Sequence, residues 1–243
     1  MKWTQSLRTT MLAITLLGAP LSSVVAAESI QNVDPWEGFN RKVFAFNDTL
    51  DSYMLKPLAK GYKAVTPDPV ERGVSSAFAN LKEVGNIAND LLQGKFSQAG
   101  NDTGRLLVNT TLGLAGIFDV AKHMGLPKSD GEDFGQTLAT WGVGSGPYVV
   151  LPFLGSSTVR GLGGMPANTL TDPIGYVDHV PTRNSLWGTQ LVGLRASLLE
   201  AENLISGDKY TFMRDAYLQR RNYLAKDGDV EDDFGGDFGG DGY

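Results

Sequence analysis

The sequence contains no cysteine and only two histidines, His123 and His179. Without cysteine there can be no disulfide, thiolate zinc site, iron–sulfur cluster or thiol nucleophile. A metal site or a serine–histidine pair would need one of the two histidines, and neither has a partner at ligand spacing. We therefore expect no catalytic residues, no metal and no cofactor.

Long apolar runs are also missing. A membrane-spanning helix needs about 20 apolar residues, and no run in the sequence is that long. The longest candidate, 11–18, follows Lys2 and Arg8 and precedes the small residues 25–27. This arrangement is typical of a secretory signal peptide. We predict that residues 1–27 form a signal peptide and that the mature chain is exported to the periplasm.

Basic charge is scarce, and the net charge of −6 comes from the C-terminus. Residues 227–243 hold seven acidic side chains and no basic ones, which leaves the preceding sequence nearly neutral. The sequence has no cluster of basic residues of the kind that nucleic-acid-binding proteins carry. The sequence predicts one domain over 28–228 and a disordered acidic tail over 229–243.

Residues 34–48 read DPWEGFNRKVFAFND and contain four aromatic side chains. Asp34 as N-cap and Pro35 in the first turn predict the start of a helix, which should end before Pro57. Phe44 lies off the apolar stripe of this helix. The stripe advances in steps of three and four residues and consists of Trp36, Phe39, Val43, Phe46, Leu50 and Tyr53.

Helical patterns dominate the remainder, and strand signals are scarce. We expect a mostly α, single-domain fold with little or no β-sheet. The expected helices cover 68–91 with a stop at Gly94, 105–119 as a closely packed helix, 132–141, a short helix capped by Ser156 or Ser157, a helix from Asn184 or Ser185 to about Gly207, and one from Asp208 to Gly228.

A glycine-rich segment, GVGSG at 142–146, precedes the proline-broken apolar run YVVLPFL at 148–154. Alternate glycines allow backbone conformations that other residues resist, and the proline disfavours a helix. We expect a hairpin-like loop that places apolar side chains against another surface. The segment is not a phosphate loop, because the lysine of that motif is missing.

Amphipathic helices and apolar loops in an exported chain favour an interfacial membrane protein or a lipid carrier. The same apolar stripes would also suit the core of a soluble helical protein. A soluble periplasmic lipid-binding carrier and a periplasmic hydrolase remain alternatives at this point.

An ordered set of motifs between residues 29 and 228 resembles the MlaA (VacJ) family of outer-membrane phospholipid-transport proteins. These motifs are DPWEGFNR at 34–41, LQG at 92–94, RLLVNTTLG at 105–113, GVGSGPY at 142–148, LPF at 151–153 and DAYLQR at 215–220. The resemblance implies a helical ring in the inner leaflet of the outer membrane, beside a trimeric porin, and no enzymatic activity. Mislocalised phospholipids would pass through its channel from the outer leaflet to a periplasmic phospholipid carrier, which maintains lipid asymmetry.

The resemblance also implies functional residues. The glycine-rich loop would be a mobile channel element, comprising Gly142, Gly144, Gly146 and Tyr148. The N-terminal helix would face lipid or pack the ring through Trp36, Phe39, Phe44 and Phe46, and an aromatic residue off the main stripe favours lipid. Family members are often lipoproteins with a cysteine at the cleavage site, where this chain has Val25-Ala26-Ala27-Glu28. We therefore expect an outer-membrane protein on the periplasmic side that is not lipidated.

Overall fold

The computed structural model describes residues 33–229. The chain divides into two compact units, Met1–Gln31 and Asn32–Tyr243, and the fold described here belongs to the second. The predicted signal peptide lies outside the described residues, as does the predicted acidic tail apart from Asp229.

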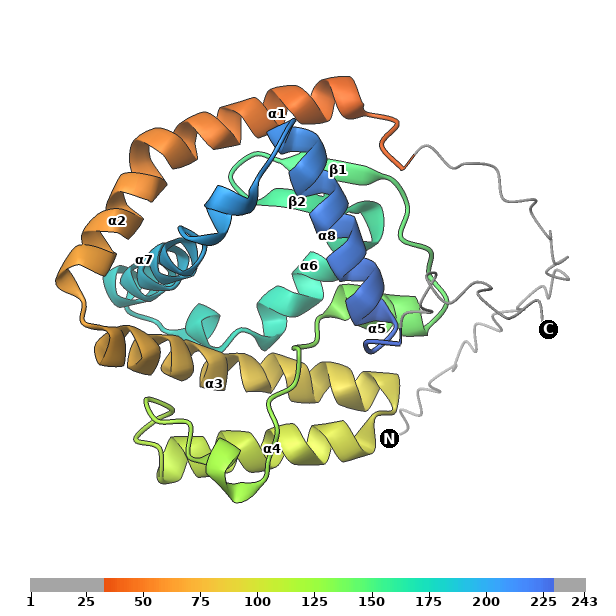
Figure 1. Ribbon diagram of the computed structural model, residues 1–243. Coiled ribbons are helices and arrows are strands. Elements are labelled where there is room, and N and C mark those ends of the chain that lie inside the picture. The colour runs from red at the N-terminus through yellow and green to blue at the C-terminus, as the bar shows by residue number, and fades with distance from the viewer. Residues whose placement is uncertain (1–32, 230–243) are drawn as a thin grey trace, which may run out of the picture. The chain divides into compact units, whose positions relative to one another are not determined.

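Helices make up most of the described chain, which confirms the predicted mostly α fold. They follow one another in a ring, and α4 lies against α3 on the side away from α6 and α8 (Figure 1). In chain order the elements are α1 (Glu37–Leu50), η1 (Asp51–Leu55), α2 (Lys56–Val65), α3 (Asp68–Gln93), α4 (Phe96–Thr111), η2 (Ala121–Met124), α5 (Phe134–Thr140), β1 (Tyr148–Leu151), β2 (Gly155–Thr158), α6 (Val159–Thr171), η3 (Pro173–Tyr176), α7 (Val180–Ser197), η4 (Ala201–Leu204) and α8 (Lys209–Ala225).

The first helix begins later than predicted, because Asp34 is not its N-cap. Trp36 occupies that position and makes no side-chain cap. The Asp34 carboxylate is buried and accepts hydrogen bonds from Asn40 Nδ2, at 2.7 Å, and from the Tyr210 hydroxyl. A partner 176 residues away on α8 has replaced the local cap.

The predicted end before Pro57 is also wrong, since the helix continues to Val65. The turn η1 is a π-helix, in which the Lys56 N–H donates to the Asp51 carbonyl five residues back. A widened turn changes the backbone register just before Pro57, whose missing N–H and bulky ring would otherwise break a regular helix. The elements α1, η1 and α2 therefore form one continuous arc (Figure 1).

The apolar segment 105–119 is only partly helical. Helix α4 ends at Thr111, and Leu114 and Ala115 then adopt positive φ angles of 50° and 57°. Gly116 follows at φ 87°, and a Cβ there would lie 2.5 Å from the Cβ of Asn80 on α3. The glycine is thus required for a tight loop against α3 and not for helix packing.

Two further helix starts differ from the predictions. Thr158, not Ser156 or Ser157, caps α6 by accepting the Gly161 N–H at 3.1 Å, because strand β2 extends to Thr158 and the helix begins only at Val159. Helix α7 starts at Val180, earlier than predicted, with His179 as N-cap. The predicted stop at Gly94 and start after Asp208 are confirmed.

The predicted hairpin exists, but the glycine loop 142–146 is not its turn. That loop connects α5 to β1, and the hairpin turns at 152–154, with Phe153 at φ 65°. Strands β1 and β2 pair antiparallel in the register Tyr148↔Thr158. These two strands are the only ones in the described part of the chain.

Two asparagines of α1 cover the second edge of β1. Asn40 Nδ2 donates to the Tyr148 carbonyl at 3.1 Å, and Asn40 Oδ1 accepts the Val150 N–H at 2.9 Å. Two helical turns later, Asn47 makes the same pair of hydrogen bonds: its Nδ2 donates to the Leu151 carbonyl, and its Oδ1 accepts the Phe153 N–H. Each side-chain amide thereby replaces the peptide group of a neighbouring strand.

The small core forms where this hairpin meets α1 and α8. Tyr148, Val150 and Tyr210 are buried together, with Val43, Phe44, Tyr217 and Leu218 packed around them. The rings of Phe44 and Tyr210 meet edge to face at a centroid distance of 5.5 Å. The N-terminal helix is thus joined to the C-terminal helix through the hairpin.

We predict that Asn40→Ala destabilises the protein by about 2–4 kcal/mol, because it leaves several buried polar groups without partners. Thermal unfolding of the purified protein measures this effect. Asn47→Ala is the matched control and should have a smaller effect, because Asn47 is only partly buried. Equal unfolding temperatures for wild type and Asn40→Ala would contradict the role assigned to Asn40.

Candidate functional site

The described residues distribute polarity in an unusual way. Only nine apolar residues are buried, fewer than the thirteen polar or charged residues that are buried. Thirty-five large apolar side chains are exposed. Soluble monomers rarely expose large contiguous apolar surface. This distribution indicates a protein whose outer surface contacts something apolar.

The arc of α1, η1 and α2 carries part of this exposed apolar surface. Three of the four aromatic residues predicted to face lipid or pack the ring are exposed: Trp36, Phe39 and Phe46. Phe44 instead packs inward against Tyr210. Phe44 therefore packs the ring, whereas the three stripe residues are exposed, and their contact with lipid stays a prediction. The exposed row continues along η1 and α2 through Tyr53, Met54, Leu58 and Val65.

More apolar side chains are exposed at the loop after α4 and around the hairpin. Phe153 and Leu154 at the hairpin turn are among the most exposed large apolar residues, at 78% and 70%. Near the glycine loop, Trp141 and Val143 are also exposed. At and after α4 the exposed set is Phe96, Leu107, Leu112, Leu114, Ile117 and Phe118.

A polar cavity of about 650 Å³ lies among α3, α6, α7 and α8 and the segment before α5. Amides and charged groups dominate its lining, including Asn86, Asn89, Asn168, Gln190, Arg220 and Arg221. Lys82 of α3 and Arg220 of α8 both line it. Within residues 33–229, neither cation forms an ion pair or a hydrogen bond with another side chain. The cavity therefore presents two cations that are unpaired within this range, in a lining of mixed charge that also contains Asp130, Glu132, Asp133 and Asp172.

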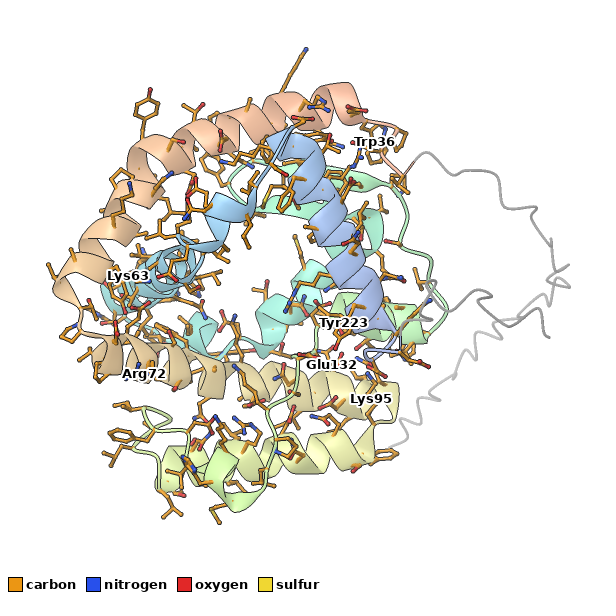
Figure 2. All side chains as sticks on the ribbon, in the orientation of Figure 1. Trp36, Lys63, Arg72, Lys95, Glu132 and Tyr223 are labelled. Carbon is orange, nitrogen blue, oxygen red and sulfur yellow. The ribbon has the colours of Figure 1, made fainter. Side chains whose placement is uncertain are left out.

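Ion pairs fix the wall of this cavity near the start of α5. Asp133 caps α5 through the Gln136 N–H at 3.0 Å and also pairs with Arg221 of α8. Burial opposes ionisation of Asp133, but the Arg221 guanidinium outweighs it, so the pKa of Asp133 is lowered. Figure 2 shows Lys95 and Glu132 pointing toward each other, where their charged groups are 3.0 Å apart.

The glycine loop and Tyr148 occupy different environments. Gly142 and Gly144 are exposed, and a Cβ on either would meet no atom within 4 Å. Gly146, at φ 65°, lies against Val159. Tyr148 is fully buried, and its hydroxyl shares a 2.8 Å hydrogen bond with Ser156. The structure thus separates Tyr148 from the loop glycines with which it was grouped.

Sequence reasoning missed Lys82 and Arg220. Arg220 ends the DAYLQR motif at 215–220, so the motif contained one signal for it. Nothing in the sequence distinguishes Lys82 from other lysines, because being unpaired depends on the folded arrangement. The two histidines lie apart from this cavity's lining: His123 is in η2, and His179 caps α7.

One buried carboxylate lacks a partner. Asp90 of α3 is fully buried, and neither of its oxygens has a hydrogen-bond partner in the described part of the chain. Burial, reinforced by the charges of Asp102 and Glu132, raises the pKa of Asp90 to about 7. Asp90 is therefore protonated in the folded protein over a range in which it would be ionised in the unfolded chain.

Comparisons with known proteins agree on one family. The profile of the MlaA lipoprotein family matches residues 32–224. The intermembrane phospholipid transport system lipoprotein MlaA of Shigella flexneri is 37% identical, over 82% of this chain and 80% of its own. The protein of the same name from Haemophilus influenzae is 32% identical, over 89% and 88%.

A solved structure gives the same result. It comes from work on the structural basis for maintenance of bacterial outer membrane lipid asymmetry. Its TM-score to this chain is 0.70 at 37% sequence identity, and the match covers 79% of this chain and 98% of the solved one. The likeness confirms the helical architecture.

The localisation predicted from the sequence needs a correction. The relatives are named lipoproteins, which contradicts the expectation of a protein that is not lipidated. The sequence has no cysteine, and the expected cleavage site at 25–28 lies outside the described residues. Among the helices of residues 33–229, none combines the length and apolar character needed to cross a membrane.

The raised pKa of the buried Asp90 carboxylate predicts that the stability of the fold depends on pH. Because the pKa is raised on folding, the folded state binds more protons than the unfolded state between pH 4 and 7, and stability falls as pH rises through that range. Asp90→Asn should stabilise the protein at pH 8 by about 1–3 kcal/mol and flatten this dependence. Thermal unfolding at pH 5 and pH 8 tests it, and an unchanged pH slope would contradict the assignment.

Proposed function

The chain belongs to the MlaA lipoprotein family, and from this premise we propose that it acts in intermembrane phospholipid transport at the outer membrane. It removes mislocalised phospholipids from the outer leaflet and so maintains lipid asymmetry. The observation that carries this proposal is the combination of an exposed apolar row along α1, η1 and α2 with a cavity lined by amides and charged groups.

The geometry suits the two halves of a phospholipid. A charged headgroup is costly to move through hydrocarbon unless polar groups replace its water. Asparagine and glutamine side chains in the cavity offer such groups, and Lys82 and Arg220 offer charge-assisted hydrogen bonds to a phosphate. The exposed apolar row from Trp36 to Val65 contacts lipid and holds the ring in the inner leaflet.

Partner proteins complete the pathway in this proposal. A trimeric porin packs against part of the exposed apolar surface, and a soluble periplasmic phospholipid carrier receives the lipid. Transport requires no chemical step, so the protein is not an enzyme. A soluble lipid carrier, the alternative, would leave membranes in carbonate, whereas a ring seated in the leaflet needs detergent.

We predict that the double substitution Lys82→Ala and Arg220→Ala raises outer-leaflet phospholipid toward the level of a deletion strain. Losing two charge-assisted contacts should slow transport at least about tenfold. Surface phospholipid in complemented deletion cells measures the effect. Controls are His123→Ala and Lys60→Ala, which changes an exposed lysine of α2 that forms no ion pair within residues 33–229. Full complementation by the double variant would refute the headgroup role.

The glycine loop remains a proposed mobile element of the channel. Gly142→Val and Gly146→Val impose a side chain on positive φ angles, whereas Gly144→Val adds bulk in open space. All three should raise outer-leaflet phospholipid, and the first two should also lower the unfolding temperature. Unchanged lipid asymmetry in all three variants would rule out a functional role for the loop.

A further inference from the structure

A second cavity, of about 350 Å³, lies between α1, the hairpin, η4 and the first turns of α8. Its lining differs from that of the polar cavity, because aromatic and aliphatic side chains dominate it. They are Phe44, Val150, Leu198, Ile205, Phe212 and Met213. We call this cavity the apolar groove. The proposed headgroup site does not use it.

The charged residues at the rim of the groove neutralise one another. Arg195 forms a two-point contact with Asp51, at 2.7 and 2.9 Å, and also pairs with Glu202 at 2.9 Å. Lys209 pairs with Asp48 at 2.5 Å. With its cations engaged in this way, the rim offers no free positive charge to an anionic headgroup. The groove is therefore suited to an uncharged, apolar ligand.

The apolar groove and the polar cavity lie along the same two helices. On α8, Phe212 lines the groove and Arg220 lines the cavity, eight residues or about 12 Å further along. On α7, Arg195 belongs to the groove and Gln190 to the cavity. A single amphiphilic molecule can therefore occupy both, with its charged end near Arg220 and its apolar part directed toward Phe212.

We infer that the apolar groove binds an acyl chain of the transported phospholipid while the phosphate lies between Lys82 and Arg220. This inference rests on the proposed function and specifies how the lipid lies along α8. At about 30 Å³ for a water-sized group such as a methylene, the groove holds roughly a dozen chain carbons. Burying those carbons within the ring would stabilise the lipid during transfer, since each methylene removed from water is favourable.

Photo-crosslinking of the purified full-length protein in nanodiscs tests the inference. One probe is phosphatidylethanolamine with a diazirine at the end of one acyl chain, and a second carries the diazirine on the headgroup. Peptide mapping should place the chain-end label on the peptide that contains Phe212 and Met213. The headgroup label should fall near Arg220. Chain-end labelling confined to the exposed apolar row from Trp36 to Val65 would overturn the inference.

A matched pair of variants separates groove occupancy from general damage. Ala201 is exposed and lines the groove, so Ala201→Phe fills it without removing a core atom. Asn203→Phe adds the same ring to the same turn of η4 outside the groove lining. Chain-end labelling should fall about tenfold in Ala201→Phe, the loss expected when about two methylenes stay in water, and should be unchanged in Asn203→Phe. Equal labelling in both variants would overturn the inference.

The outcome also distinguishes this inference from the proposed function. If the wild-type gene restores lipid asymmetry to deletion cells but the groove is never labelled, the groove inference alone fails. If the groove is unlabelled and Ala201→Phe still impairs transport, its occupant is a partner protein or a second copy of the chain and not an acyl chain. If the wild-type gene does not restore asymmetry, the proposed function itself fails.

Discussion

The hydrogen bonds of Asn40 connect the N-terminal helix α1 to the β-hairpin. Its amide binds the buried Asp34 carboxylate and both a carbonyl and an N–H of β1, more than 100 residues later. Tyr148 of β1 packs against Tyr210 of α8, whose hydroxyl returns to Asp34. Buried polar groups are costly unless paired, so this cycle stabilises one closed arrangement over others. The positions of both cavities depend on that closure.

Polar contacts of this kind replace much of an ordinary apolar core. Arg105 of α4, for example, is buried with Glu83 of α3 at 3.2 Å and also binds Asp119. Buried ion pairs add little net stability, but they are lost at high cost when one partner is removed, and they favour one specific packing. Large apolar side chains are consequently free to face outward, where the lipid surrounding of the proposed function would remove the penalty that water imposes.

The sequence predicted those elements whose signals are local. Helix α3 ends at Gly94 because a glycine can adopt the left-handed conformation, and α8 begins after Asp208. It failed where a distant partner overrides a local signal, as for Asp34, which is bound by Tyr210 and does not cap α1. The same distinction holds for the candidate site. The apolar stripe and the glycine loop have local signals in the sequence, whereas the lack of an ion-pair partner for Lys82 among the described residues depends on the folded arrangement.

Helix α8 shows why the proposed transport path is harder to predict from the sequence than the outer surface. A helix at a membrane surface separates polar and apolar residues onto two faces, which produces a periodic signal. A helix along a path for an amphiphile must instead separate them along its axis. On α8, Phe212 and Met213 line the apolar groove and Arg220 and Arg221 line the polar cavity, while Lys209 also lines the groove and Leu224 the cavity. A contrast along the helix axis leaves no stripe in the sequence, and in the proposed path it places the acyl chain at one end of α8 and the phosphate at the other.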